Sequence, residues 1–345
     1  MKMGIPRSSV IFAGSLIAVA VSADPIQSPI FLVQSTEPLV MINMSNDHEL
    51  YFKAYDDYSD IDGGGPETTY KHSVDYYGYF DSTTCYDYSS GVFVPNAKAD
   101  ADNYCSRNWS GNFLNWATMT RMDTIRKTLY GGYRSTDTSS KTVLERSFLP
   151  TDAHSFAKYY AGSDLSKLTP YTKITELSMC NTTQASTGNS KDVSEPPLMR
   201  VATGNFSMWS SHEGVQCQWY EESTASNNND VDVTGIPASS VPPAEAATGS
   251  GEFIVRVEVC LSEALAEENC RKYPTSTHRT PTGLVQEHGD DGSVHFGLMT
   301  GSYANNTSGG VLRKNVSSFA NEVNEDSDGT FVATPTGGGI VDTLN

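Results

Sequence analysis

The chain has 345 residues, of which 41 are acidic and 23 are basic, so its formal net charge is −18 at pH 7. This acidity argues against nucleic acid or an anionic membrane surface as a partner, and it suits solubility and divalent cations. The length exceeds that of one average domain and is enough to bury a substantial core.

The first residues have the three-part pattern of a cleaved secretory signal. Lys2 and Arg7 supply positive charge, residues 10–21 are apolar, and small residues stand where a signal peptidase reads. The apolar stretch is too short to span a bilayer of roughly 30 Å, and no later stretch approaches about 20 apolar residues. We predict that residues 1–23 are removed, that residues 24–345 act outside the cytoplasm, and that no transmembrane anchor remains. A buried N-terminal helix is the alternative.

The N-terminal half predicts an early strand followed by an irregular aromatic region. Residues 30–44 are typical of extended chain, with a buried strand over residues 39–42. Residues 51–88 are rich in tyrosine, acidic residues and glycine. We expect an ordered surface module there rather than a helix.

The clearest predicted helix spans residues 110–132. Ser110 can cap its start, apolar residues follow at near-helical spacing, and Gly131-Gly132 can end it. A second helix is predicted over residues 152–160, after Pro150 and Thr151.

The C-terminal half begins with a low-complexity segment. Residues 221–251 lack periodic apolar residues and predict a flexible loop. Strands are predicted over residues 253–260 and 294–300. Residues 334–339 form a Gly-rich loop that opens into a helix, and the chain stops inside that helix. We expect the sequence to be a fragment of a longer protein.

Cysteine usage predicts a disulfide framework. None of the cysteines forms a Cys-x-x-Cys pair, which argues against zinc and redox motifs. An even number in an exported chain favours disulfides, and we expect the sequential pairs because each closes a short loop. Free thiols in a cytosolic chain are the alternative. The six cysteines are Cys85, Cys105, Cys180, Cys217, Cys260 and Cys270.

Two segments resemble metal-binding loops. After the first strand, Asn43-x-Ser45-x-Asp47 resembles the Asp-x-Ser-x-Ser sequence of von Willebrand factor A domains, which holds a divalent cation, usually Mg²⁺. Here the first carboxylate is missing and another stands at the last position. The alternatives are a Mg²⁺ site through Ser45 and Asp47, or a strand-end turn without metal; we favour the turn.

The second segment is Asp60-Ile-Asp62-Gly-Gly-Gly-Pro-Glu67, which resembles the front of a calcium loop. The third acidic position of such a loop is glycine here, and oxygen ligands fall short of the six or more that Ca²⁺ prefers. The segment is therefore either a degenerate calcium site or an acidic turn.

These elements predict an α/β fold: an incomplete von Willebrand factor A-like doubly wound sheet with long, disulfide-held, loop-rich insertions. We place the insertions at about residues 48–108 and 165–251. The seven histidines are scattered, and the chain has no His-Glu-x-x-His, Gly-x-Ser-x-Gly or phosphate-binding loop. The sequence therefore favours a protein that is not an enzyme.

Five segments spread over most of the mature chain carry a resemblance to one family. They are residues 55–63, 69–81, 109–132, 144–154 and 308–315, and the block from Trp109 to Gly132 is the most specific of them. Together they resemble the PilY/PilC family of type IV pilus tip-associated adhesin and biogenesis proteins.

The resemblance implies an exported protein of the periplasm, outer surface and pilus tip of a Gram-negative bacterium. It implies minor pilins as partners, a role in pilus assembly and twitching motility, and attachment to host cells or abiotic surfaces. The family's calcium-binding C-terminal β-propeller lies outside this chain. Two other interpretations stay open: a secreted enzyme that depends on a divalent metal, and a mechanical module that transmits force without metal.

Overall fold

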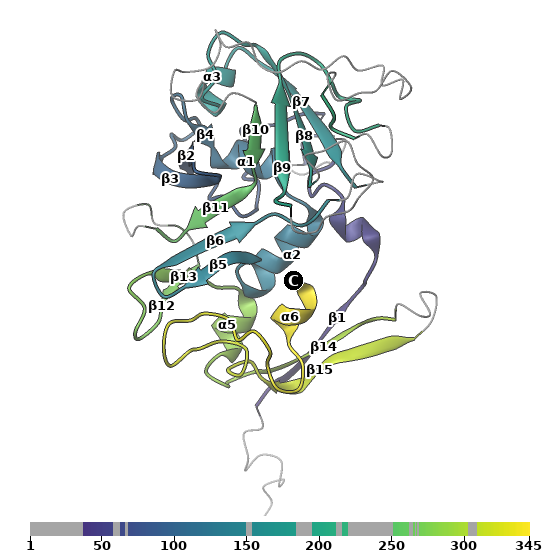
Figure 1. Ribbon diagram of the computed structural model, residues 1–345, viewed down its shortest axis with the longest axis vertical. Coiled ribbons are helices and arrows are strands. Elements are labelled where there is room, and N and C mark those ends of the chain that lie inside the picture. Colours follow the sequence, from purple (N-terminus) through teal and green to yellow (C-terminus); the bar gives the residue numbers. More distant parts are fainter. Residues whose placement is uncertain are drawn as a thin grey trace, which may run out of the picture. The chain divides into compact units, whose positions relative to one another are not determined.

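Figure 1 shows the computed structural model, in which residues Pro38–Asn345 form one compact unit. The predicted signal peptide lies outside the described residues, as does the predicted flexible loop apart from its last glycine. The structure describes residues 37–57, 63–65, 68–149, 154–183, 195–211, 216–219, 251–261, 265, 267, 269–302 and 309–345.

One core surrounds a three-stranded sheet with the order β1-β14-β15. β1 (Leu39–Met44) runs parallel to β14 (His295–Gly301), and β15 (Gly310–Ser318) pairs antiparallel on the other side of β14. Three helices pack their apolar residues with this sheet: α2 (Arg121–Tyr130), α5 (Leu284–Gly289) and α6 (Ile340–Leu344). The strands predicted over 39–42 and 294–300 and the helix predicted after the Gly-rich loop are confirmed.

The first strand is not buried, however, and this part of the prediction is wrong. β1 has a single neighbour, so it forms an edge of its sheet. Ile42 and Met44 pack into the core, whereas Leu39 is 70% exposed and Met41 is 43% exposed. The continuous apolar run indicated burial on both faces, but in the described structure one face of β1 and its outer edge are uncovered.

The helix predicted over residues 110–132 is two helices, α1 (Gly111–Thr118) and α2. Ser110 caps the first and Gly131 ends the second with a φ of 85°, as expected. Between them Met119 is extended, and Thr120 begins a new helix through a capping box with Asp123. The apolar spacing continues across this break, which is why the pattern predicted one helix.

A second and larger core surrounds two further sheets. The six-stranded sheet has the order β4-β2-β3-β11-β6-β5, and the four-stranded sheet has the order β10-β9-β8-β7. A two-stranded sheet joins β12 to β13, and two short helices, η2 and α3, lie in the connections. The bounds are η2 His48–Tyr51, β2 Thr84–Ser89, β3 Val92–Lys98, β4 Trp109–Ser110, β5 Arg134–Thr138, β6 Lys141–Glu145, β7 Phe156–Ala161, α3 Leu165–Leu168, β8 Glu176–Thr182, β9 Leu198–Ala202, β10 Glu252–Ile254, β11 Arg256–Val259, β12 Cys270–Lys272 and β13 Arg279–Pro281.

The aromatic region over residues 51–88 supplies this second core rather than a surface module. Tyr76, Tyr79 and Tyr86 are each at most 2% exposed, and their rings pack with those of Phe80 and Phe93. Buried tyrosine needs a partner for its hydroxyl group. Here Tyr86 Oη accepts a hydrogen bond from the Asp81 amide and Tyr79 Oη accepts one from the Tyr133 amide. The high tyrosine content therefore marks a core with satisfied hydroxyl groups.

Two other secondary-structure predictions need correction. Where a helix was predicted over residues 152–160, the described part is strand β7, whose side chains at 156, 158 and 160 alternate inward and pair with β8. The strand predicted over 253–260 is two strands, β10 and β11, in different sheets. Val255 separates them, so a continuous β pattern does not imply one continuous strand.

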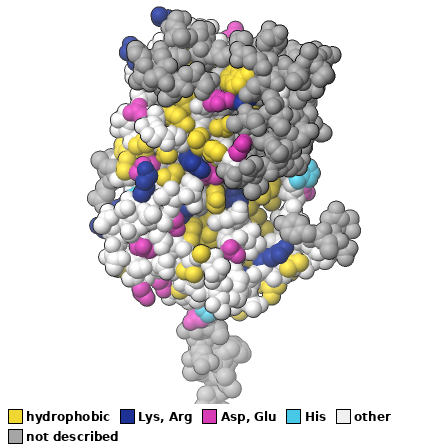
Figure 2. Space-filling view, in the orientation of Figure 1, with side chains coloured by type: hydrophobic (Ala, Val, Ile, Leu, Met, Phe, Trp, Pro, Cys, Tyr) yellow, Lys and Arg dark blue, Asp and Glu magenta, His cyan; other side chains and the backbone are white. Residues whose placement is uncertain are grey.

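The cysteines are joined in the three sequential pairs expected from the sequence: Cys85–Cys105, Cys180–Cys217 and Cys260–Cys270. Within the described residues, no helix is both long enough and apolar enough to cross a bilayer. Figure 2 shows acidic and basic side chains dispersed over one face of the molecule rather than gathered into a single-sign patch.

Candidate functional site

A cavity of about 740 Å³ opens at the carboxyl ends of β1 and β14. Because these two strands are parallel, their ends meet at one edge of the sheet, where ligand sites of α/β proteins commonly form. Apolar side chains of Leu50, Met122 and Leu344 line part of the cavity. Its polar lining comes from Ser45, Asn46, Asp47, His48, His154, Thr300, Arg313, Asp342, Thr343 and Asn345.

The structure brings two of the three predicted Mg²⁺ ligands to this cavity. Ser45 and Asp47 line it, but Asn43 does not. Asn43 pairs with Met299 in the β1–β14 register and is exposed on the face opposite Ile42 and Met44, which pack into the core. The three positions therefore do not converge on one point.

The side-chain oxygens of Ser45 and Asp47 already accept local hydrogen bonds. The Asp47 amide donates to Ser45 Oγ at 2.9 Å, and the Glu49 amide donates to Asp47 Oδ1 at 3.0 Å. The second contact makes Asp47 the N-cap of η2, a role that carboxylates commonly fill. This geometry fits the alternative interpretation from the sequence, a turn that ends β1 and starts a short helix.

Several polar residues of the cavity were missed because they are distant in sequence. Thr300 is the next-to-last residue of β14, and its Oγ1 accepts a hydrogen bond from Arg313 Nε at 2.9 Å. Asp342 comes from the first turn of α6, and His154 stacks edge-on against His48 with ring centroids 5.4 Å apart. Only Thr300 had a sequence signal, since it ends a strand predicted to lie in the same sheet as residues 39–42.

The described residues bring together one group of three side chains with metal-binding atoms. This group is Cys260, Glu267 and Cys270, and its two sulfur atoms are joined in a disulfide rather than available as thiolates. The group therefore does not fit a zinc or other thiolate site, because such a metal needs the deprotonated sulfur as its ligand.

The predicted calcium-loop residues Asp60, Asp62 and Glu67 lie outside the described residues. The segment just before them is anchored by a buried lysine. Lys158 Nζ donates to Asp57 Oδ1 at 2.8 Å and to the Tyr55 carbonyl, and it lies 4.8 Å from the centre of the Trp116 ring. Burial lowers the pKa of the Lys158 ammonium to about 8, although Asp57 opposes this shift.

A second cleft, of about 280 Å³, lies between residues 75–83 and the loop closed by Cys260–Cys270. Glu267 lines it and accepts a hydrogen bond from the Leu261 amide at 3.0 Å. Burial and the nearby Asp81 carboxylate raise the pKa of Glu267 to about 7. This carboxyl group therefore changes its charge close to neutral pH.

The block from Trp109 to Gly132 organises the second core through its polar side chains. Asn115 Nδ2 donates to the carbonyls of Tyr76 and Phe80, at 2.7 and 2.8 Å, and its Oδ1 accepts from the Phe80 amide at 3.1 Å. Asn112 binds the neighbouring turn in the same way, through the Tyr76 amide and the Val74 carbonyl. These two asparagines replace the strand partners that the irregular segment lacks.

Asp123 has a similar role on α2. Its Oδ2 accepts from Thr120, and its Oδ1 accepts from the amide and the hydroxyl group of Ser147, both at 2.8 Å. Asp123 is fully buried, so these bonds compensate for its lost hydration. The same carboxylate therefore caps α2 and ties it to the chain that follows β6.

Comparison with known proteins places the block from Trp109 to Gly132 within a domain that a family model matches. A family model described as the small alpha/beta domain of PilY1 homologs matches residues 67–202, and one described as the second domain of PilY1 homologs matches residues 296–345. No solved structure matches the chain.

Two curated relatives from Xylella fastidiosa (strain Temecula1 / ATCC 700964) are each named type IV pilus biogenesis factor PilY1 homolog. One is 36% identical over 310 residues, covering 82% of this chain and 19% of the relative. The other is 30% identical over 263 residues, covering 71% of this chain and 19% of the relative. The chain thus spans about a fifth of the length of the curated relatives it matches. On these matches, the chain belongs to the PilY1 family.

Proposed function

We propose that this chain is part of a type IV pilus biogenesis factor and contributes to pilus assembly. The observation that carries the proposal is the 36% identity to a protein of that name, which extends over 82% of the chain. Three disulfides and buried polar anchors such as Asn115 fit a role outside the cytoplasm, where thiols are oxidised and the fold must persist.

The finer role that we propose is that of a pilus tip-associated adhesin. In this role the chain binds minor pilins in the periplasm, is displayed at the pilus tip, and supports twitching motility and attachment to host cells or abiotic surfaces. The resemblance of residues 55–63 and 109–132 to tip-associated adhesins supports this role. It requires no catalysis, so we place the chain among proteins that are not enzymes.

We also propose that β1, β14 and β15, with α2 and α6, belong to a von Willebrand factor A-like domain. The parallel pairing of β1 with β14 supports this, as does the shared hydrophobic core that residues of α2 form with residues of both strands. The insertions predicted at about residues 48–108 and 165–251 then supply β2, β3, β8 and β9 to the remaining sheets. The cavity at the carboxyl ends of β1 and β14 is the place where such a domain would bind a ligand, with or without Mg²⁺ or Ca²⁺.

The binding proposal is tested with the purified chain and the minor pilins of the same bacterium. We expect the chain to retain at least one minor pilin on an affinity resin, and we expect boiled chain to retain none. The matched control is a disulfide-bonded periplasmic protein of similar acidity. Equal recovery on the chain and on this control would contradict direct binding to minor pilins.

The alternative of a metal-dependent secreted enzyme predicts a different result. It needs acidic residues that converge with a cation in one cleft, and the residues assigned to that role, Asp60, Asp62 and Glu67, lie outside the described structure. Hydrolysis of a peptide or glycan mixture that requires Ca²⁺ or Mg²⁺ and is lost in Asp60→Asn would favour the enzyme over the adhesin.

A further inference from the structure

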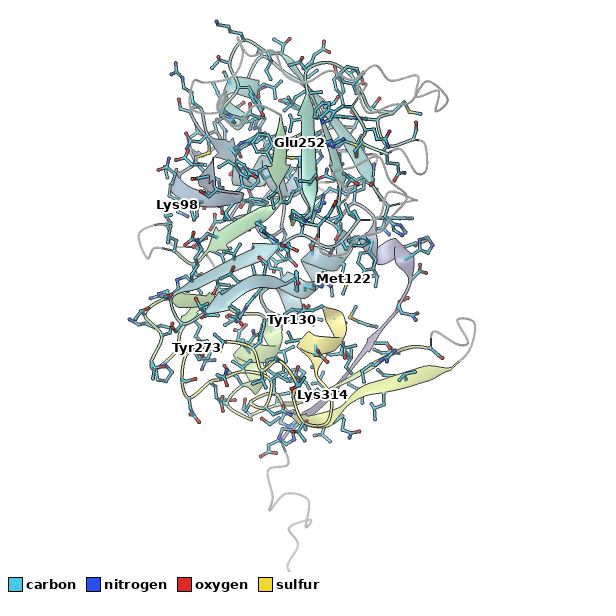
Figure 3. The ribbon with its side chains drawn as sticks, in the orientation of Figure 1. Lys98, Met122, Tyr130, Glu252, Tyr273 and Lys314 are labelled. Atoms are coloured by element: carbon cyan, nitrogen blue, oxygen red, sulfur yellow. A yellow bond between two sulfur atoms is a disulfide. The ribbon has the colours of Figure 1, made fainter. Side chains whose placement is uncertain are left out.

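A buried ion pair lies between β15 and the start of α6. Lys314 is in β15 and Glu322 follows the end of that strand, and both side chains are 1% exposed. Lys314 Nζ lies 2.7 Å from Glu322 Oε1. Figure 3 labels Lys314 beside the lower sheet. Neither the sequence patterns nor the proposed function gives this pair a role.

An amide side chain lies within reach of the same lysine. Lys314 Nζ donates a hydrogen bond to Asn321 Oδ1 at 3.1 Å. The amide carbon of Asn321 is one carbonyl bond, about 1.2 Å, from that oxygen. Asn321 Nδ2 donates to the Thr336 carbonyl at 3.2 Å, which fixes the plane of the amide. An amine, an amide and a carboxyl group thus meet at one place.

Burial of the Glu322 carboxyl group favours its neutral form and raises its pKa. The hydrogen bonds that this group accepts from Lys314 and from the Val341 amide, the latter at 3.0 Å to Oε2, oppose the shift but do not cancel it. The fully buried Phe319 ring supplies apolar surroundings, with its centroid 5.9 Å from Lys314 Nζ. In apolar surroundings a charged pair can become a neutral pair by moving one proton from the ammonium group to the carboxylate.

We propose that Lys314, Asn321 and Glu322 form a site of autocatalytic cross-linking, in which an isopeptide bond joins Lys314 Nζ to the side-chain carbon of Asn321. Glu322 takes a proton from the lysine ammonium group, which leaves a neutral amine as the nucleophile. The amine attacks the amide carbon. Glu322 gives its proton to the departing nitrogen and takes the second proton from the attacking nitrogen, so neutral ammonia leaves and the carboxyl group ends protonated. One N–C bond forms, one C–N bond breaks, and ammonia leaves, so no oxidant, cofactor or other reactant is needed.

The arrangement also favours reaction of Lys314 with Asn321 over reaction of Lys314 with Glu322. Condensation of Lys314 with Glu322 itself would expel water from a carboxylate that nothing activates. The asparagine amide offers a leaving group that Glu322 can protonate, and the short distances supply the effective concentration that such a reaction needs. Lys158 makes a comparable ion pair with Asp57 at 2.8 Å, but no asparagine or glutamine contact to its Nζ is found in the described structure. Lys158 is therefore an internal control that stays unmodified.

The product is detected by mass spectrometry of the purified, reduced and alkylated chain. Trypsin cleaves after Lys314 only when that side chain is free, and residues 315–345 contain no lysine or arginine. From the purified chain of residues up to 345, we expect the cross-linked peptide to begin at Lys314 and to be lighter than its sequence by about 17 Da, the mass of ammonia. Fragmentation should give no backbone ions from within residues 314–321, because that segment is closed into a ring.

Three variants distinguish the isopeptide bond from other reactions that release ammonia. Asn321→Ala removes the electrophile at an exposed position and should restore cleavage after Lys314 and the full sequence mass. Glu322→Gln should leave the lysine free or slow its reaction at least tenfold. A succinimide at Asn321 has the same mass loss, but it would persist in Lys314→Arg, whereas the isopeptide bond would not.

The deciding measurement is the peptide mass of the wild-type protein after incubation at pH 7 for several days. A blocked Lys314 with the mass loss located between residues 314 and 321 supports the site. Complete cleavage after Lys314 at full sequence mass would overturn it, as would a mass loss that persists in Lys314→Arg. In either case Lys314 and Glu322 are an ordinary buried ion pair.

Discussion

Replacing Asn115 by alanine tests whether the Trp109–Gly132 block holds the second core together. The substitution removes three hydrogen bonds, two to carbonyls and one from an amide, all contributed by the buried residues Tyr76 and Phe80. Each buried polar group left without a partner costs roughly 1–3 kcal/mol. Allowing for partial relaxation, we expect Asn115→Ala to lower the free energy of unfolding by about 4 kcal/mol.

The assay is urea denaturation of the oxidised chain, followed by tryptophan fluorescence and far-ultraviolet circular dichroism. With a slope of roughly 2–3 kcal/mol/M, the midpoint should fall by about 1.5 M. Asn96→Ala is the matched control, because Asn96 is exposed and its Nδ2 donates to the exposed Asp87 at 2.8 Å. That change should cost less than about 0.5 kcal/mol. Equal effects of the two variants would refute the role assigned to Asn115.

Three further predictions follow from the disulfides, the second cleft and the cavity. Replacing both cysteines of Cys180–Cys217, which closes a loop of 37 residues, should lower the free energy of unfolding by about 4 kcal/mol. Replacing Cys260 and Cys270, which close a 10-residue loop, should lower it by about 3 kcal/mol. If the second variant had the lower urea midpoint, the result would contradict the chain-entropy account. Because the pKa of Glu267 is raised from 4.5 to about 7 in the folded state, the wild type loses stability as the pH rises from about 5 to about 7, and the loss is complete above that range. Glu267→Gln should therefore be more stable than wild type by about 2 kcal/mol at pH 8 and nearly equal to it below about pH 5, and a pH-independent difference in urea midpoint would count against this. Asp47 already caps η2, so we expect millimolar Mg²⁺ to change the thermal unfolding midpoint of the wild type and of Asp47→Asn by the same amount. A rise in the wild type that is absent in Asp47→Asn would support the predicted metal site instead.

The parts of the fold that could be predicted are those in which local signals and tertiary structure agree. Ser110 caps the start of α1 through its hydroxyl group, and Gly131 ends α2 in a left-handed conformation. Both effects act within one helical turn, so the local sequence reveals them. The disulfide pairs could be predicted because each joins cysteines that are neighbours in sequence order. For the candidate site, Ser45 and Asp47 could be placed because they directly follow a predicted strand.

The parts that could not be predicted depend on contacts between distant residues. The break at Thr120 is stabilised by Asp123 and by Ser147, which is far along the chain. Residues 156–160 are a strand because they pair with β8, a preference that local helix signals cannot reveal. His154, Arg313 and Asp342 join the cavity only after β14, β15 and α6 have packed around β1.

The central claim is that the chain is part of a pilus biogenesis factor, and counting surface pili tests it most directly. The measurement compares pilin sheared from wild-type cells, from a clean deletion of the full gene, and from the deletion strain that carries the full gene again. The account predicts that surface pili are lost in the deletion strain and restored by the returned gene. Equal amounts of surface pilin in all three strains, with total pilin unchanged, would contradict it.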